Sequence, residues 1–136
     1  MTTHILKLCV GVDDVADLAA WQARTLRNHP APFHQTRMVP KRRDDVLDGG
    51  SIYWVIKGVI QVRQRIVDIR EIIDRTERRA CELVFDPELV RVEPTPKRAF
   101  QGWRYYKPED APRDLADTQV DAPPELLSDL KDAMVW

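Results

Sequence analysis

The sequence has few of the residues that bind metals or act as catalytic nucleophiles. Its 136 residues include two cysteines, three histidines and two serines, and the two cysteines, Cys9 and Cys81, do not form a C-x-x-C pair. Zinc sites and serine hydrolases need spacings that are missing here, C-x-x-C pairs and Gly-x-Ser-x-Gly respectively. The Gly49-Gly50 pair precedes an expected strand, whereas phosphate-binding loops lead into a helix. We therefore assign no metal site and no cofactor.

Long hydrophobic runs are also missing. The best run, residues 51–56, stops at Lys57, whereas a membrane-spanning helix needs about 18 apolar residues. The first ten residues contain Lys7 and lead into Asp13-Asp14, which is unlike an export signal. We expect a cytoplasmic protein with no membrane partner, in which both cysteines are free thiols.

The composition is that of a folded domain whose charge is unevenly distributed. Hydrophobic residues make up 43% and charged residues 32%, typical of a globular chain. Residues 37–104 hold 15 basic and 11 acidic residues, whereas residues 105–136 hold 3 basic and 8 acidic ones. We predict one domain over residues 1–115, followed by an acidic tail, residues 116–136, with a short amphipathic helix near 124–134.

Hydrophobic periodicity predicts an α+β fold. A helix over residues 15–27 is expected to begin at a cap formed by Asp13 or Asp14, because a carboxylate accepts a hydrogen bond from the first turn. Asp86-Pro87-Glu88 suggests a hairpin turn between two short strands. We expect a strongly bent, mostly antiparallel sheet or a small β-barrel, with an N-terminal and a C-terminal helix. The expected strands cover residues 4–10, 34–39, 51–57, 59–69, 81–85, 89–93 and 100–106.

Two features of the predicted strands indicate which parts of the sheet are buried. The strand 51–57 is apolar on both faces, so we expect it at the centre of the sheet. Gln64 falls on the apolar face of the strand 59–69, and a buried amide must be hydrogen-bonded to avoid a desolvation penalty.

A basic segment is the first candidate site. It contains His34, Thr36, Arg37, Lys41 and Arg42 beside a rigid proline. Arginine can bind phosphate with two parallel hydrogen bonds and lysine with a point charge. The alternative is a solvated basic turn whose charge neighbouring aspartates partly neutralise.

Two further groups could complete such a site. Arg63 and Arg65 lie on one face of their predicted strand, about 7 Å apart. Trp103, Arg104 and Tyr105 could form a stacking pocket for a flat ring. The alternatives are a polar outer strand face and a strand whose aromatic side chains pack on the first helix.

Several segments together resemble a family of short alphaproteobacterial proteins, a domain of unknown function. A weaker similarity, in the order of the short helix, residues 47–55 and the returning strand 60–66, is to the PUA-like barrels, including the ASCH and EVE groups. That similarity implies a PUA-like barrel and binding of RNA or modified bases. The segments that carry the first resemblance are residues 6–11, 36–42, 49–58 and 100–105.

These observations favour a binding module for RNA or a modified nucleotide, with the cations on phosphates and Trp103 stacked on a base. The alternative is a small enzyme acting on a nucleotide-like or anionic substrate, with His34 as general base and Arg37 and Arg104 holding the anion. A third possibility is an interaction subunit that docks through its C-terminal helix.

Overall fold

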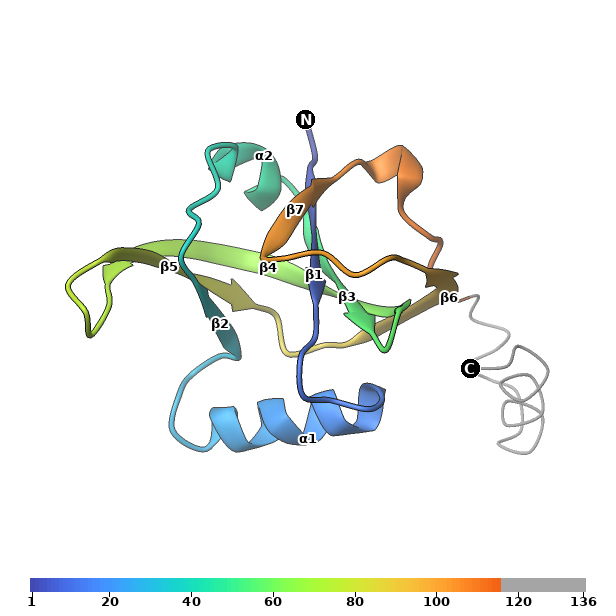
Figure 1. Ribbon diagram of the computed structural model, residues 1–136, viewed down its shortest axis with the longest axis horizontal. Helices are drawn as coiled ribbons and strands as arrows, with labels where there is room; N and C mark the ends of the chain where they lie inside the picture. The colour runs from blue at the N-terminus through green and yellow to red at the C-terminus, as the bar shows by residue number, and fades with distance from the viewer. Residues whose placement is uncertain (116–136) are drawn as a thin grey trace.

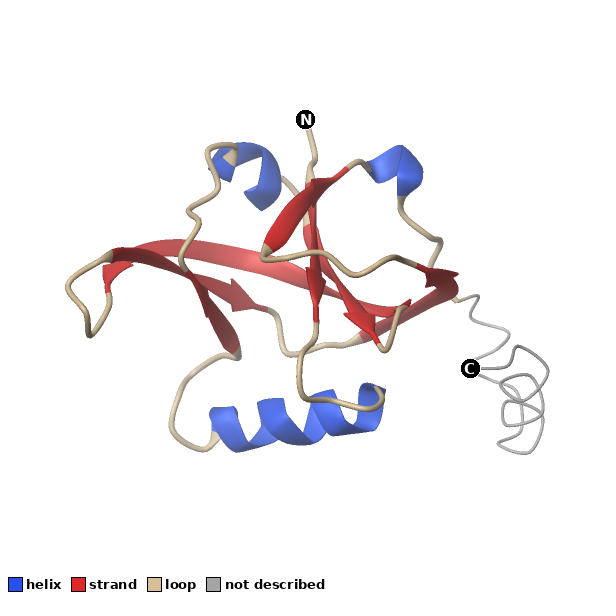
Figure 2. Cartoon of the chain, viewed as in Figure 1, coloured by secondary structure: helices blue, strands red, loops and turns tan. Residues whose placement is uncertain are grey.

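The computed structural model describes residues 1–115, and the expected tail with its helix lies outside them (Figure 1). Seven strands form one sheet, accompanied by two α-helices and a short 3₁₀ helix (Figure 2). Within this part of the chain, no helix is long and apolar enough to cross a membrane. The elements are β1 (His4–Leu8), α1 (Val15–Leu26), β2 (Phe33–Thr36), α2 (Arg43–Leu47), β3 (Ser51–Ile56), β4 (Val59–Ile73), β5 (Arg79–Phe85), β6 (Val90–Pro96), β7 (Trp103–Tyr106) and η1 (Pro108–Asp110).

The sheet is bent, open and mostly antiparallel. Its strands follow the order β2-β5-β4-β3-β1-β7, and β6 also pairs with β4. The β1–β3 pair is parallel and the other strand pairs are antiparallel. The expected α+β class and bent sheet are therefore present. Within residues 1–115, β2 and β7 stand at the two ends of this order, so the strands form an open sheet rather than a closed barrel.

The long strand β4 organises the sheet. Its first half pairs with both β3 and β6, and its second half pairs with β5. The predicted hairpin turn at Asp86-Pro87-Glu88 is wrong. The strands β5 and β6 on either side of it do not pair with each other, because each pairs with a different half of β4. The strand runs to Ile73, and the hairpin turn lies at residues 74–78, where the Asp74 carboxylate accepts hydrogen bonds from the backbone N–H groups of Thr76 and Arg78.

The strand β3 is buried along its whole length, as its two apolar faces indicated. It turns into β4 through Lys57 and Gly58, whose φ angles are 50° and 79°. Positive φ at both positions is the geometry of a tight type I′ hairpin turn. At the start of β3, a Cβ atom on Gly50 would collide with the carbonyl oxygens of Thr3 and Val46, so a close backbone approach explains this glycine.

Hydrophobic clusters occupy both faces of the sheet. The larger one lies on the face that α1 covers, and it includes Leu18 of α1, Val46 of α2 and Trp54 of β3 (Figure 1). The smaller one gathers Tyr53, Tyr106 and their neighbours on the opposite face. The helix α1 begins at Asp14, whose carboxylate accepts the Asp17 backbone N–H at 2.8 Å.

Gln64 is completely buried and fully hydrogen-bonded, as predicted. Its amide N–H groups donate to the side-chain oxygen of Gln22 at 2.7 Å and to the carbonyl of Asp86 at 2.9 Å. Its side-chain oxygen accepts from Gln22 at 2.8 Å and from the Trp54 indole at 3.2 Å. This polar network connects α1 to the centre of the sheet.

Candidate functional site

Four of the ten sequence-predicted site residues line cavities, and these cavities are three separate ones rather than one. His34 lines a cavity of about 390 Å³ beneath α1. Arg37 and Lys41 line a second of about 390 Å³, and Arg63 lines a third of about 440 Å³. The remaining predicted residues line none of these three cavities; they are Thr36, Arg42, Arg65, Trp103, Arg104 and Tyr105.

The cavity beneath α1, which we call the helix-side pocket, is more enclosed than the other two. It forms where the end of β1 and the following loop meet α1, β2 and β3. Most of its wall is apolar, with Trp21 at 39% exposure and the edge of the buried Trp54. The lining residues are Lys7, Leu8, Cys9, Val10, Gly11, Val12, Leu18, Trp21, His34 and Trp54.

Lys7 carries the positive charge of the helix-side pocket. In the strand register it stands between Trp54 of β3 and Trp103 of β7. Within residues 1–115 its ammonium group has no hydrogen bond or ion pair, and desolvation lowers its pKa. Lys7 therefore places a partly desolvated positive charge in the pocket wall, where an anion could bind to it.

Lys7 is not among the site residues predicted from the sequence, although the strand pattern around it carries a signal. Strand alternation that places Leu6 and Leu8 on one face leaves Lys7 on the other, together with Ile5 and Cys9. Lys7 is therefore a polar residue on a strand face that otherwise belongs to the core, which is the same pattern that identified Gln64 as a buried polar residue.

His34 stands beside this lysine in the pocket wall. Its ring meets Trp54 edge-on, with centroids 5.9 Å apart. Burial and then the charge of Lys7 lower the pKa of His34 to about 4, so its imidazole is neutral at pH 7. A neutral imidazole offers one hydrogen-bond donor and one acceptor to a bound molecule.

Cys9 is a packing residue in the same wall. Burial raises the pKa of its thiol to about 11, with Lys7 opposing the shift, so little thiolate exists at neutral pH. Cys9 and Cys81 are both free, as expected.

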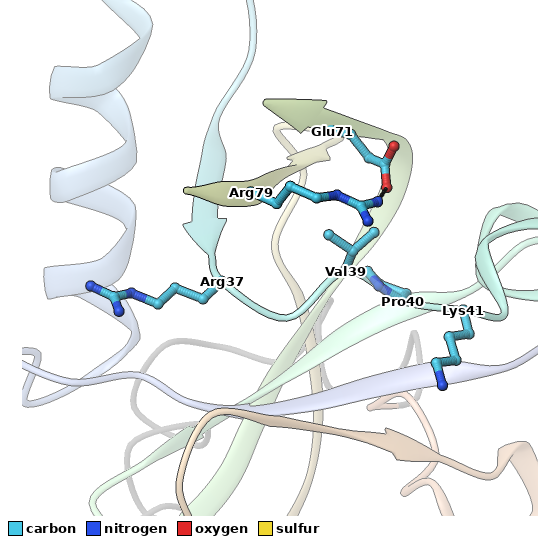
Figure 3. Close-up of a pocket in the computed structure, with 6 residues that line it drawn as sticks. All are labelled: Arg37, Val39, Pro40, Lys41, Glu71 and Arg79. Atoms are coloured by element: carbon cyan, nitrogen blue, oxygen red, sulfur yellow. Dashed lines mark hydrogen bonds and ion pairs between the residues drawn. The ribbon is translucent and has the colours of Figure 1, made fainter. Parts of the chain in front are cut away.

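The second cavity belongs to a basic surface formed by Arg37, Lys41 and Arg79 around Val39 (Figure 3). Its cations do not converge. Arg79 forms an ion pair with Glu71, whereas the Arg37 and Lys41 side chains point away from that pair and from each other (Figure 3). The basic surface is open to solvent, where isolated charges contribute little.

Neighbouring arginines of the predicted site are engaged within the protein. Arg42 pairs with Asp45 at 3.1 Å. Arg63 makes two hydrogen bonds of 2.7 Å to Asp114 and a third, of 3.1 Å, to the Ser51 hydroxyl. These bonds raise the pKa of Arg63 and lower that of Asp114. Arg63 therefore holds the segment after η1 against the sheet, while Arg65 is exposed.

The aromatic cluster divides between core and surface. Trp103 is 4% exposed, belongs to the larger core cluster and donates its indole N–H to the Met38 carbonyl at 2.8 Å. Tyr105 is 39% exposed, and Arg104 lies over the Phe100 ring at 5.1 Å. Because both faces of Trp103 are covered, its burial fits the packing alternative better than stacking on a base.

The fold and the helix-side pocket define a small α+β protein with a ligand-sized, mostly apolar cavity among the residues described. Within residues 1–115, no cluster of three potential metal ligands occurs. The chain matches the family "Protein of unknown function (DUF1489)" over residues 5–136 and therefore belongs to it. No curated protein and no solved structure matches the chain.

Proposed function

We propose that this protein binds a small organic anion with a flat, apolar part in the helix-side pocket. The observation that carries the proposal is Lys7, a half-buried ammonium group in a mostly apolar wall with no acidic partner in the described part of the chain.

The energetic argument follows from desolvation. A charged group that loses water without gaining a partner pays a penalty, and an anionic ligand would remove it. A hydrogen bond involving a charged group contributes about 1.5–3 kcal/mol. Lys7 would therefore recognise the negative group, and the neutral His34 would supply a further hydrogen bond.

The size and lining of the pocket favour a small ligand. Pockets for small molecules span about 300–1,000 Å³, and this one lies near the lower end at about 390 Å³. Trp21, which is 39% exposed, offers an aromatic contact to a ring, and Trp54 also lines the pocket. A molecule with one or two rings and one acidic group matches this combination.

RNA binding through the basic surface has weaker support. Arg42, Arg63 and Arg79 are paired with carboxylates of the protein itself. Of the three cations of the basic surface itself, Arg37 and Lys41 have no ion pair within the described residues, but they diverge (Figure 3). Two separated surface charges are a small electrostatic footprint for a polyanion.

Catalysis in the same pocket is a second candidate function. His34 is neutral at pH 7 and could accept a proton from a bound substrate. A base with a pKa of about 4 is weak near neutrality, where efficient general bases have a pKa close to the working pH. Ligand binding is therefore our first proposal.

Amide NMR tests the site directly. We would titrate the ¹⁵N-labelled full chain with 4-methylbenzoate and, as the matched uncharged control, 4-methylbenzyl alcohol. The proposal expects saturable shifts from the carboxylate around residues 7–12, Trp21 and His34, and weaker shifts from the alcohol. Shifts centred on Arg37 and Lys41, or equal responses to the two probes, would contradict it.

A further inference from the structure

Lys7 differs in environment from the other lysines of the described chain. Lys57 pairs with Asp13 at 3.0 Å, and the ammonium group of Lys97 lies 5.4 Å from the centre of the Tyr106 ring. Lys41 and Lys107 are exposed. Lys7 alone among these five combines partial burial with a place in the wall of an enclosed cavity.

We propose that Lys7 is a nucleophile that forms an imine with its ligand, so that the helix-side pocket takes organic anions bearing an aldehyde or ketone group. This inference rests on the proposed function, because it uses the same pocket and the same class of anion.

The chemistry needs no further reactant. The uncharged amine of Lys7 attacks the carbonyl carbon, giving a carbinolamine after proton transfer from nitrogen to oxygen. Loss of the hydroxyl group as water then forms the C=N bond. The products are one imine and one water molecule, and no atom is oxidised or reduced overall.

Three features of the pocket favour this reaction. Desolvation lowers the pKa of Lys7 and so increases the fraction of uncharged amine. The neutral imidazole of His34 can hydrogen-bond the hydroxyl group of the carbinolamine and so position it. The apolar wall limits the water that would hydrolyse the imine.

The reaction is also compatible with binding of an anion. A protonated imine carries the same positive charge as the ammonium group that it replaces. A carboxylate or phosphate on the ligand can therefore remain beside Lys7 after condensation. Cys9 does not compete, because its thiol pKa of about 11 leaves little thiolate to attack the carbonyl.

Reductive trapping tests the inference on the full chain. We would incubate the protein at pH 7 with 4-formylbenzoate and sodium cyanoborohydride, and follow each lysine by peptide mass mapping. We expect Lys7 to be labelled about tenfold faster than Lys41, because binding in the pocket holds the aldehyde beside the Lys7 amine. Labelling spread evenly over the lysines would overturn the inference.

Matched controls keep the result interpretable. In Lys7→Arg the fast label should disappear, and in Lys41→Arg it should remain. Excess 4-methylbenzoate, which has no aldehyde, should slow labelling of Lys7 in the wild-type chain and leave the exposed lysines unchanged. This competition needs no variant, so it decides the question even if Lys7→Arg does not fold; labelling of Lys7 that is indifferent to the competitor would count against the pocket reaction.

The two proposals fail differently. Saturable binding of 4-methylbenzoate with no preferential labelling of Lys7 would overturn the imine and leave the anion site standing. Preferential labelling of Lys7 without binding of 4-methylbenzoate would overturn the anion proposal, and with it the inference that the pocket takes carbonyl-bearing anions.

Discussion

The helix-side pocket and the basic surface contain the same kinds of charge in opposite environments. The basic surface has three cations around an open hollow, and one of them is already paired with Glu71. The helix-side pocket has one cation, Lys7, in a mostly apolar wall that is less open than the basic surface, and Lys7 has no partner among the described residues. Charges interact more strongly where water is excluded. A single lysine in the pocket can therefore contribute more to recognition than several arginines in solvent.

The two regions also differ in how firmly the fold supports them. Trp54 of the pocket wall donates its indole N–H to Gln64. Gln64 is hydrogen-bonded to Gln22 and so joins α1 to the sheet. The basic surface follows a short edge strand, β2, and its cations Arg37 and Lys41 are exposed. Rigid support favours a site that must hold a ligand in one orientation.

The largest effect should come from Gln64. In Gln64→Leu, the Gln22 amide, the Trp54 indole and the Asp86 carbonyl all lose a buried partner. We expect the free energy of unfolding to fall by about 2–4 kcal/mol, measured by urea denaturation. The exposed Gln35→Leu is the control and should change it by less than about 0.5 kcal/mol. Equal effects would show that the network does not support the pocket.

The next effect concerns pH. The folded pKa of His34 is about 4, below the ordinary value of 6.5, so the unfolded chain binds more protons between these values. Stability should therefore fall as pH decreases through this window, by about 1–2 kcal/mol since the ring is partly exposed. In His34→Phe the fall should be smaller. Denaturation at several pH values measures it, and a His34→Phe curve parallel to wild type would contradict the assignment.

A smaller effect should distinguish Arg63 from Arg65 on the same strand. Arg63→Met breaks the two-pronged contact with Asp114 and should cost about 1 kcal/mol, because both partners are partly exposed. Arg65→Met removes an exposed side chain and should cost less than about 0.5 kcal/mol. Thermal unfolding of the two variants makes the comparison, and equal melting temperatures would argue that Arg63 does not anchor the segment after η1.

The smallest stability effect should have the opposite sign. Lys7→Met removes a desolvated charge and keeps an apolar side chain of similar length, so we expect a gain of about 0.5–1 kcal/mol. Lys41→Met, in solvent, should leave the stability unchanged. A clear loss in Lys7→Met, measured by urea denaturation, would mean that the ammonium group stabilises the fold and would weaken its assignment to a ligand.

Local patterns predicted much of the fold but less of the site. The burial of β3 and the hydrogen bonding of Gln64 follow from alternation within one strand. The β5–β6 arrangement does not, because each of these strands pairs with β4 rather than with the other, and a turn signal cannot reveal a third strand. Lys7 meets Trp54 and Trp103 only through pairings that join distant parts of the chain. Its neighbours were therefore not visible in the sequence, and the basic segment appeared more prominent.

The most direct test of the central claim is calorimetric titration of 4-methylbenzoate into wild-type protein, Lys7→Met and Lys41→Met. Loss of one charged hydrogen bond corresponds to about 1.5–3 kcal/mol, so Lys7→Met should weaken binding by about ten- to a hundredfold. Lys41→Met should bind like the wild type. If Lys7→Met binds as tightly as the wild type, or if Lys41→Met causes the larger loss, the ligand site is not the helix-side pocket.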